Sequence, residues 1–263
     1  MSPTSATVEL EISQGIATLT LSDPPRKNCM SPELGDALQV RIAELIGRSD
    51  LRAAVLRGAG GTFSAGGDLA MLDKLRASSF EEARRHMLSF YARYLSLLDL
   101  PVPLVAAVEG AAIGAGLCVA LACDLIIVAD DAKLALNFVS LGLHPGMGAT
   151  YLVPRRAGAQ RGLELLMSGR RFDGKEAVSL GLALEAVPAA EVTFTAQRHA
   201  QKFAQGGPLA IRALKKNLGV DRDALQQALE REALAQAESY GSDDLGEGLK
   251  AAAERRAPHF KGK

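Results

Sequence analysis

Two turns rich in small residues present backbone groups that could do chemistry. Gly114-Ala115-Gly116 stands where an apolar run ends and a short apolar helix is expected to begin. The first N–H groups of a helix have no partner within it, so they can donate to a developing oxyanion. A second turn, Thr62 to Leu69 (TFSAGGDL), offers another exposed donor beside glycines. Each turn alone is equally consistent with tight packing, but together they could supply one N–H each to a single carbonyl oxygen.

Several side chains near these turns have alternative interpretations. His144 could act as an acid or base near neutral pH, or could be a loop histidine bonded to the backbone. Cys118 could be a nucleophile, but a thiol on an apolar helix is usually a small core residue. Asp68 could be a pocket carboxylate, but more often such a residue caps the helix that follows it. Asn137 could orient a carbonyl or a water molecule, or cap an edge.

Strands and helices are expected to alternate around the two turns. Alternating apolar residues on either side of Gln14-Gly15 predict a hairpin. Ser31 followed by Pro32 predicts a helix start, with Gly47 at its end. The central stretch predicts a buried strand, a turn, a short helix and a second buried strand. The expected strands are 8–12, 16–20, 53–57, 104–108, 125–128, 133–137 and 184–187. The expected helices are 32–46, 80–98, 115–121, 158–168 and 175–180, and 69–76 is expected to be either a short helix or a mobile loop.

From Glu191 onward the chain changes character. Long helical patterns dominate there, among them 209–218, 223–240 and 243–256. The segment 142–148, by contrast, is expected to be a loop because it holds glycines and a proline.

His86, Tyr91 and Tyr94 could reach a pocket if the region 69–94 folds over it.

Composition narrows the class of protein. The 263 residues are 48% hydrophobic and 23% charged, which is ordinary for a soluble globular protein with a substantial core. Thirty basic and thirty acidic residues balance, so nothing indicates a nucleic-acid or membrane partner. No signal peptide or membrane-spanning run is visible. Three cysteines are too few for a disulfide framework and do not form a zinc pattern, so a reducing cytoplasm is expected.

Five segments, taken in order, resemble one family. FSAGGDL and VEGAAIGAGLCVALACDL resemble the two signatures of the crotonase superfamily, the enoyl-CoA hydratase/isomerase family. LNFVSLGLHPGMGA, LELLMSGRR and ERRAPHFKGK continue the resemblance over almost the whole chain. It implies an α/β fold with a spiral of strand–strand–helix units and an acyl-CoA site in residues 1–190. Residues 191–263 would form a helical region for assembly as a homotrimer or a dimer of trimers.

The resemblance also implies a set of site residues. The N–H groups of Ala65 and Ala115 would form the oxyanion hole, and Arg26, Lys27, Phe260 and Lys263 would contact coenzyme A. CoA would be the carrier of the acyl substrate, with acyl carrier protein as an alternative carrier. No permanently bound cofactor and no metal is expected. Further expected contacts are Gly67, Asp68 and Leu69 on the CoA side and Gly110, Gly114, Cys118, Asn137, Phe138, Pro145 and Gly146 on the acyl side.

The sequence departs from the family pattern at the acyl end. The two glutamates that activate water in hydratases correspond to Cys118 and Phe138, and the loop aspartate of some isomerases corresponds to Gly146. The run from Asn137 through PGMGAT resembles decarboxylating crotonases of polyketide β-branching. Those enzymes use a lysine and a C-terminal histidine instead, for which Lys74 is a loose counterpart and Gln236 stands in the histidine position.

These observations leave three hypotheses. The preferred one is an enzyme of the enoyl-CoA hydratase/isomerase type, as in fatty acid metabolism, that stabilises a thioester enolate but lacks the usual water-activating pair. The second is a decarboxylase or other lyase with a proton donor such as His144. The third is a catalytically silent acyl-CoA binder.

Overall fold

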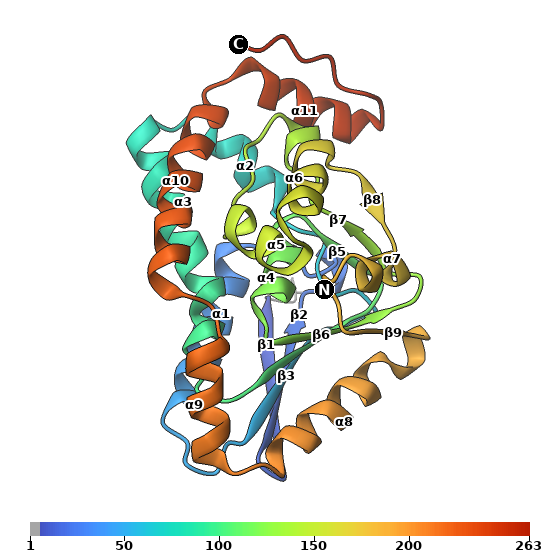
Figure 1. The fold of residues 1–263 in the computed structure, drawn as a ribbon. Helices are drawn as coiled ribbons and strands as arrows, with labels where there is room; N and C mark the ends of the chain where they lie inside the picture. Colours follow the sequence, from blue (N-terminus) through green and yellow to red (C-terminus); the bar gives the residue numbers. More distant parts are fainter. Residues whose placement is uncertain (1–5) are drawn as a thin grey trace.

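A six-stranded sheet runs through the protein (Figure 1). The computed structural model describes residues 6–263. The first two strands form the expected hairpin, with Gln14 and Gly15 in left-handed conformations, and every later neighbour pairs in parallel. Parallel strands covered on both faces are apolar throughout, as the runs in β4 and β6 are. In spatial order the strands are β1 (Thr7–Ser13), β2 (Ile16–Ser22), β3 (Ala53–Gly58), β4 (Leu104–Val108), β6 (Leu125–Ala129) and β9 (Glu185–Val187).

A second, three-stranded sheet stands beside the central stretch. It joins β5 (Ala111–Ile113), β7 (Lys133–Ala135) and β8 (Arg171–Phe172). Helix α4 (Ala115–Ala122) follows β5 directly and leads into β6, so the predicted order of strand, turn, helix and strand is confirmed. The sequence did not predict β5 and β8, because two or three residues give no readable alternation.

Helix α1 (Pro32–Ile46) begins as its sequence predicts. The Ser31 side chain accepts a hydrogen bond from the N–H of Leu34, Pro32 is the first helical residue and Gly47 ends the helix. Helix α5 (Ala149–Ala157) was not expected, because Pro154 lies inside it and lacks the N–H of a regular helix. The other helices before residue 191 are α2 (Leu69–Leu75), α3 (Phe80–Leu95), α6 (Ala159–Ser168) and α7 (Gly174–Ser179), with short 3₁₀ turns η1 (Pro24–Arg26), η2 (Ser96–Asp99) and η3 (Val139–Leu141).

The C-terminal helices pack against the rest of the chain rather than forming a separate appendage. After the 3₁₀ turn η4 (Ala189–Glu191), α8 (Val192–Ala204) lies against β3, β4 and β6. Helix α10 (Arg222–Tyr240) runs along α3, and α11 (Asp243–Glu254) contacts α2 and η3 (Figure 1). Among the α-helices of residues 6–263, only α9 (Pro208–Leu218) buries none of its residues. The fold is therefore the expected α/β architecture with a helical C-terminal region, but that region helps to build the body of the protein.

The core joins α1 to α3 through a buried tyrosine. Tyr94 is fully buried, and its hydroxyl donates to the carbonyl of Ser31 over 2.7 Å, just before α1 begins. A buried carbonyl that loses its donor costs the folded state the desolvation of that group.

We expect Tyr94→Phe to lower the free energy of unfolding by about 1–2 kcal/mol. Tyr151→Phe is the matched control, because its hydroxyl contacts an exposed N–H, that of Asp221. Urea unfolding at one fixed protein concentration measures both variants. An equal decrease in the free energy of unfolding of both variants would contradict a stabilising role for the Tyr94 hydrogen bond.

Candidate active site

One cavity lies where the two small-residue turns meet α3 and α10. It is partly open to solvent, and its empty space together with the solvent at its mouth is about 600 Å³. Both turns, the start of α2 and the loop before α5 contribute to its wall. The lining residues are Ala65, Gly66, Gly67, Leu69, Met71, Leu72, Met87, Phe90, Tyr91, Ile113, Gly114, Ala115, Asn137, Phe138, Leu141, Leu143, Gly146, Met147, Gln236 and Tyr240.

The structure of the first turn contradicts the prediction that Ala65 supplies an oxyanion donor. The N–H of Ala65 already donates to the carbonyl of Lys27 over 2.9 Å, so it is not available to a ligand. The N–H groups of Gly66 and Asp68 are also engaged, with Ser64 Oγ and the carbonyl of Met30. Within residues 6–263, no atom accepts a hydrogen bond from the N–H of Gly67. The donor that this turn offers is therefore Gly67, two residues beyond the predicted one.

In the second turn, the N–H of Ala115 has no acceptor, as the sequence predicts. Gly114 adopts φ 52° and ψ −119°, a conformation that favours glycine, and its N–H donates to the carbonyl of Ala135. Ala115 is the first residue of α4, and nothing in the described part of the chain accepts from its N–H. Gly67 and Ala115 thus both line the cavity with unengaged donors.

Backbone contacts hold the two turns together. The N–H of Ser64 donates to Ala111, and that of Ile113 donates to Ser64. Gly66 has φ +92°, and a side chain there would bring its Cβ within 2.6 Å of the Ile113 carbonyl. The tight-packing interpretation therefore holds for Gly66, while the donor interpretation applies to its neighbour.

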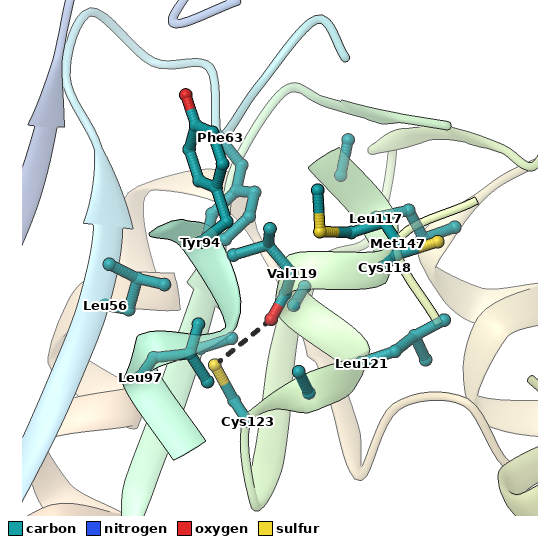
Figure 2. Close-up of a cluster of buried hydrophobic side chains, with 14 of the residues drawn as sticks. Leu56, Phe63, Tyr94, Leu97, Leu117, Cys118, Val119, Leu121, Cys123 and Met147 are labelled. Atoms are coloured by element: carbon teal, nitrogen blue, oxygen red, sulfur yellow. Dashed lines mark hydrogen bonds between the residues drawn. The ribbon is translucent and has the colours of Figure 1, made fainter. Parts of the chain in front are cut away.

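The resemblance predicts the acyl group at the end of the cavity lined by Tyr91, Phe138, Gly146 and Gln236, called the acyl end below. Among its described residues, the ionisable groups are phenols alone. Phe138 lines it, whereas Cys118 lies behind it, fully buried in the cluster around α4 (Figure 2). Burial and the nearby Glu232 raise the pKa of the Cys118 thiol well above its usual value. Among the described residues that line the cavity, there is no carboxylate, imidazole, amine or thiol.

A buried tyrosine and a glutamine supply the polarity of the acyl end. The Tyr91 hydroxyl donates to Gln236 Oε1, and Gln236 Nε2 donates to the carbonyl of His144, both over 2.8 Å. Burial raises the pKa of Tyr91 well above its usual value, so its hydroxyl stays protonated. A Cβ on Gly146 would lie 2.6 Å from both Gln236 Nε2 and the Tyr91 oxygen. The pair therefore fills the space into which a loop aspartate would project.

Three other predicted acyl-side residues do not line the cavity. The N–H of His144 donates to Ser239 Oγ, and its ring Nδ1 lies 2.6 Å from the carbonyl of Pro145. Pro145 is buried behind the wall, and Gly110 lies outside it, against the backbone of Gly61. The structure thus supports the loop interpretation of His144 and gives it no contact with the cavity.

On the CoA side, the capping interpretation of Asp68 is correct. Its side chain accepts from the N–H of Ala70 at the start of α2. Arg26 pairs with Asp23 at 2.7 Å and lies 3.5 Å from Asp68, next to Lys27, which ends η1. Leu69 lines the cavity mouth and is 46% exposed.

The predicted C-terminal contacts lie elsewhere in this chain. The tail is tied to the start of α11, since Asp244 accepts from the N–H groups of Lys261 and Gly262 and the Lys263 carbonyl accepts from Asp243. Phe260 and Lys263 are exposed there and do not line the cavity of their own chain. Their contact with CoA stays a prediction. Lys74 is exposed on α2 and also does not line the cavity.

A buried carboxylate behind the wall was missed from the sequence. Glu232 on α10 is fully buried and accepts from the N–H groups of Gly148 and Thr150 and from Thr150 Oγ1, over 2.6–2.7 Å. Burial raises its pKa to about 7, against the lowering effect of these hydrogen bonds. Glutamate is common on exposed helix faces, so the sequence gives no signal that this one faces inward.

Comparison with known proteins identifies the family. The family model described as "Enoyl-CoA hydratase/isomerase" matches residues 11–263. The chain belongs to the enoyl-CoA hydratase/isomerase family. A relative from Thermus thermophilus, named as a candidate enoyl-CoA hydratase, is 35% identical over 93% of this chain and 97% of its own.

Solved structures of this family share the fold. An enoyl-CoA hydratase/isomerase from Pseudoalteromonas atlantica is 29% identical, with a TM-score of 0.85 over 97% of this chain and all of the other. An enoyl-CoA hydratase from Bacillus halodurans is 28% identical, with a TM-score of 0.86 over 94% of this chain and all of the other. The crotonase resemblance of the sequence is confirmed.

Residues 6–263 contain neither a membrane-spanning helix nor a metal-binding cluster. No helix combines the length and the hydropathy needed to cross a bilayer. No cluster of three or more His, Cys, Asp or Glu side chains has an arrangement that could hold a metal ion.

We expect Cys118 and Cys123 to resist alkylation in the folded protein, because both are buried and burial raises the pKa of each thiol. Iodoacetamide at pH 8 followed by peptide mass spectrometry should find label at most on the half-buried Cys29. Unfolding in urea should make all three cysteines reactive. Native labelling of Cys118 would contradict its assignment as a core residue.

Proposed function

We propose that this family member acts on acyl thioesters and stabilises a thioester enolate between the N–H groups of Gly67 and Ala115. The observation that carries the proposal is that both donors line one cavity and neither has an acceptor within residues 6–263. Buried, preorganised N–H groups favour the oxyanion of an enolate over the less charged ground-state carbonyl. Glycine at 67 leaves room for a carbonyl, since a Cβ there would meet nothing within 4 Å.

Proton transfer in this proposal involves the acyl-end tyrosine. Tyr91 forms a hydrogen-bonded pair with Gln236 on this part of the described wall. Because burial raises the pKa of its hydroxyl, Tyr91 is protonated near neutral pH and therefore has a proton to supply and cannot remove one. Hydration by a glutamate pair does not fit this wall, because Phe138 and the buried Cys118 occupy the corresponding positions. The reaction that fits best protonates an enolate without adding water to the substrate. Exchange of an α-proton in this cavity would transfer that proton to solvent hydroxide or buffer at the open mouth, because the described wall offers no base.

Decarboxylation is the second candidate, and the apolar wall favours it. Breaking the bond between the α-carbon and a carboxylate releases CO₂ and leaves the electron pair in the enolate, so no carboxylate base is needed. A proton added to the α-carbon then completes the reaction. An apolar cavity disfavours the buried carboxylate of the substrate more than the neutral CO₂ and the stabilised enolate that follow.

The proposed substrate is an apolar acyl group carried by coenzyme A. Leucine, methionine and phenylalanine side chains form most of the wall, and none of the cationic side chains described lines it. Arg26 and Lys27 lie beside the turn that includes Gly67, since Arg26 is 3.5 Å from Asp68 and the carbonyl of Lys27 accepts from Ala65. From there they could meet the phosphates of the carrier. An acyl carrier protein would present the same thioester through its phosphopantetheine group.

The assay that tests the function measures incorporation of deuterium from heavy water into the acyl chain. Crotonyl-CoA and butyryl-CoA are each incubated with the protein in deuterium oxide and analysed by mass spectrometry. Deuterium in the acyl chain without added water supports enolate chemistry. Gain of water by crotonyl-CoA would overturn the argument from Cys118 and Phe138. CoA binding without exchange would move the assignment to the decarboxylase or to a silent binder.

We expect Gly67→Pro to reduce the exchange rate about a hundredfold to a thousandfold, because it removes the N–H donor. Gly67→Ala keeps the donor and adds a Cβ in open space, so it should retain activity within a few fold. Circular dichroism and acyl-CoA binding check that both variants are folded. Equal activity of the two variants would contradict a role for this N–H.

The proposed active form is a homo-oligomer built through α9. This helix buries no residue in the single chain, and Leu209, Leu214 and Leu218 are 81%, 53% and 68% exposed. Such an apolar helix surface is typical of an interface between copies.

We expect Leu209→Glu combined with Leu218→Glu to dissociate the assembly, because it places two charges on each copy in an apolar interface. Light scattering coupled to size exclusion measures the mass. Val40→Glu on α1, which is 58% exposed, should leave the mass unchanged. A wild-type protein with the mass of one chain would refute the proposed assembly.

A further inference from the structure

One face of α10 bonds to the backbone of the loop that closes the acyl end. Glu232, Gln236 and Ser239 follow one another at spacings of four and three residues, which places them on the same side of a helix. Gln236 donates to the carbonyl of His144 over 2.8 Å, and Ser239 accepts from the N–H of His144 over 3.1 Å. Glu232 takes the other end of the loop, at Gly148 and Thr150. The loop from 144 to 150 is thus fixed at both ends by side chains of one helix.

The loop needs this support because its middle is strained. Met147 has φ +62° and Gly148 φ +76°, and the left-handed region is unfavourable for a residue with a side chain. Met147 is nevertheless fully buried and lines the cavity, next to Gly146. Gly146 leaves no room for adjustment, since it packs directly against Gln236 and Tyr91. A strained segment persists only where its surroundings hold it in place.

Glu232 supplies the acceptor that α5 does not have. Gly148 stands at the N-cap position of α5 and has no side chain that could accept from the first N–H groups. The carboxylate of Glu232, 82 residues further along the chain, accepts instead from the N–H of Thr150 and from its hydroxyl. Its second oxygen accepts from the N–H of Gly148. A carboxylate at a helix N-terminus is also favoured by the helix dipole.

We propose that Glu232 is a positioning residue, which holds the wall formed by Gly146 and Met147 in the shape that receives the acyl group. It does not touch the cavity itself, and it acts through the loop that does. That the wall receives an acyl group rests on the proposed function, whereas the anchoring of the loop does not. The mechanism assigned to Gly67 and Ala115 makes no use of Glu232, so the two assignments can fail separately.

The test compares Glu232→Gln with Glu238→Gln, an exposed glutamate on the same helix. The amide keeps one carbonyl oxygen for Thr150 but presents N–H donors to the N–H of Gly148. We expect hydrogen exchange of the peptide covering 146–150 to become at least about tenfold faster in Glu232→Gln, with the rest of the chain unchanged. Glu238→Gln should exchange like the wild-type protein. Unchanged exchange at 146–150, or a uniform increase over the whole chain, would overturn the proposal.

Binding of octanoyl-CoA and of free CoA, measured by calorimetry, supplies the second readout. The preference of the wild-type protein for the acyl form should fall about tenfold in Glu232→Gln, while affinity for free CoA stays the same. A mutant that retains the acyl preference would overturn the positioning role. A wild-type protein without that preference would instead count against the proposed function, and the exchange data would still decide whether Glu232 anchors the loop.

A second pair of variants covers the case in which Glu232→Gln does not fold. Thr150 lies at an exposed position, and Thr150→Val removes the hydroxyl that donates to Glu232. The control, Thr150→Ser, keeps a hydroxyl at this position. We expect faster exchange at 146–150 in Thr150→Val and wild-type exchange in Thr150→Ser. Identical exchange in the two variants would contradict the anchoring.

Discussion

The site depends on the close approach of two backbone turns. Hydrogen bonds from Ser64 to Ala111 and from Ile113 to Ser64 fix their separation, and Gly66 lets them meet without a side chain between them. Because the backbone is fixed in this way, the N–H groups of Gly67 and Ala115, which have no acceptor, line the same cavity. Both donors belong to the backbone, so their convergence depends on the path of the chain, which the buried Ser64 hydroxyl helps to fix through hydrogen bonds with Gly66 and Asn28.

The acyl end follows the opposite principle, since its shape comes from side chains and a strained loop. Tyr91 and Gln236 fill the space in front of Gly146, and Glu232 holds the backbone behind it. Two of these three residues lie on α10, in the region that the resemblance assigned to assembly, although it also placed Gln236 at the position of a catalytic histidine. Because α10 packs along α3, the C-terminal helices complete the cavity that the N-terminal units begin.

The sequence predicted most of the strands, the cap at Ser31 and the general location of the site. These features depend on local patterns, such as alternation in β1 and β2 or a serine followed by proline. It did not predict which N–H of the first turn is available, because the bond between Ala65 and Lys27 joins two segments that are distant in the chain. The burial of Glu232 and the pairing of Tyr91 with Gln236 are missed for the same reason, since both depend on how α3 and α10 pack.

Because the oxyanion donors are backbone groups and the acid–base groups are side chains, a family member can lose its glutamates and still keep the donors. Loss of a glutamate at the positions of Cys118 and Phe138 removes a base, but it leaves the N–H groups of Gly67 and Ala115 in place. Enolate stabilisation is common to hydration, proton shifts and decarboxylation, and it needs only those donors. A change of reaction therefore requires new side chains at one end of the cavity alone. In this protein that end is apolar, rigidly held and supplied with a single tyrosine–glutamine pair, so we infer that its chemistry begins from the enolate rather than from an activated water.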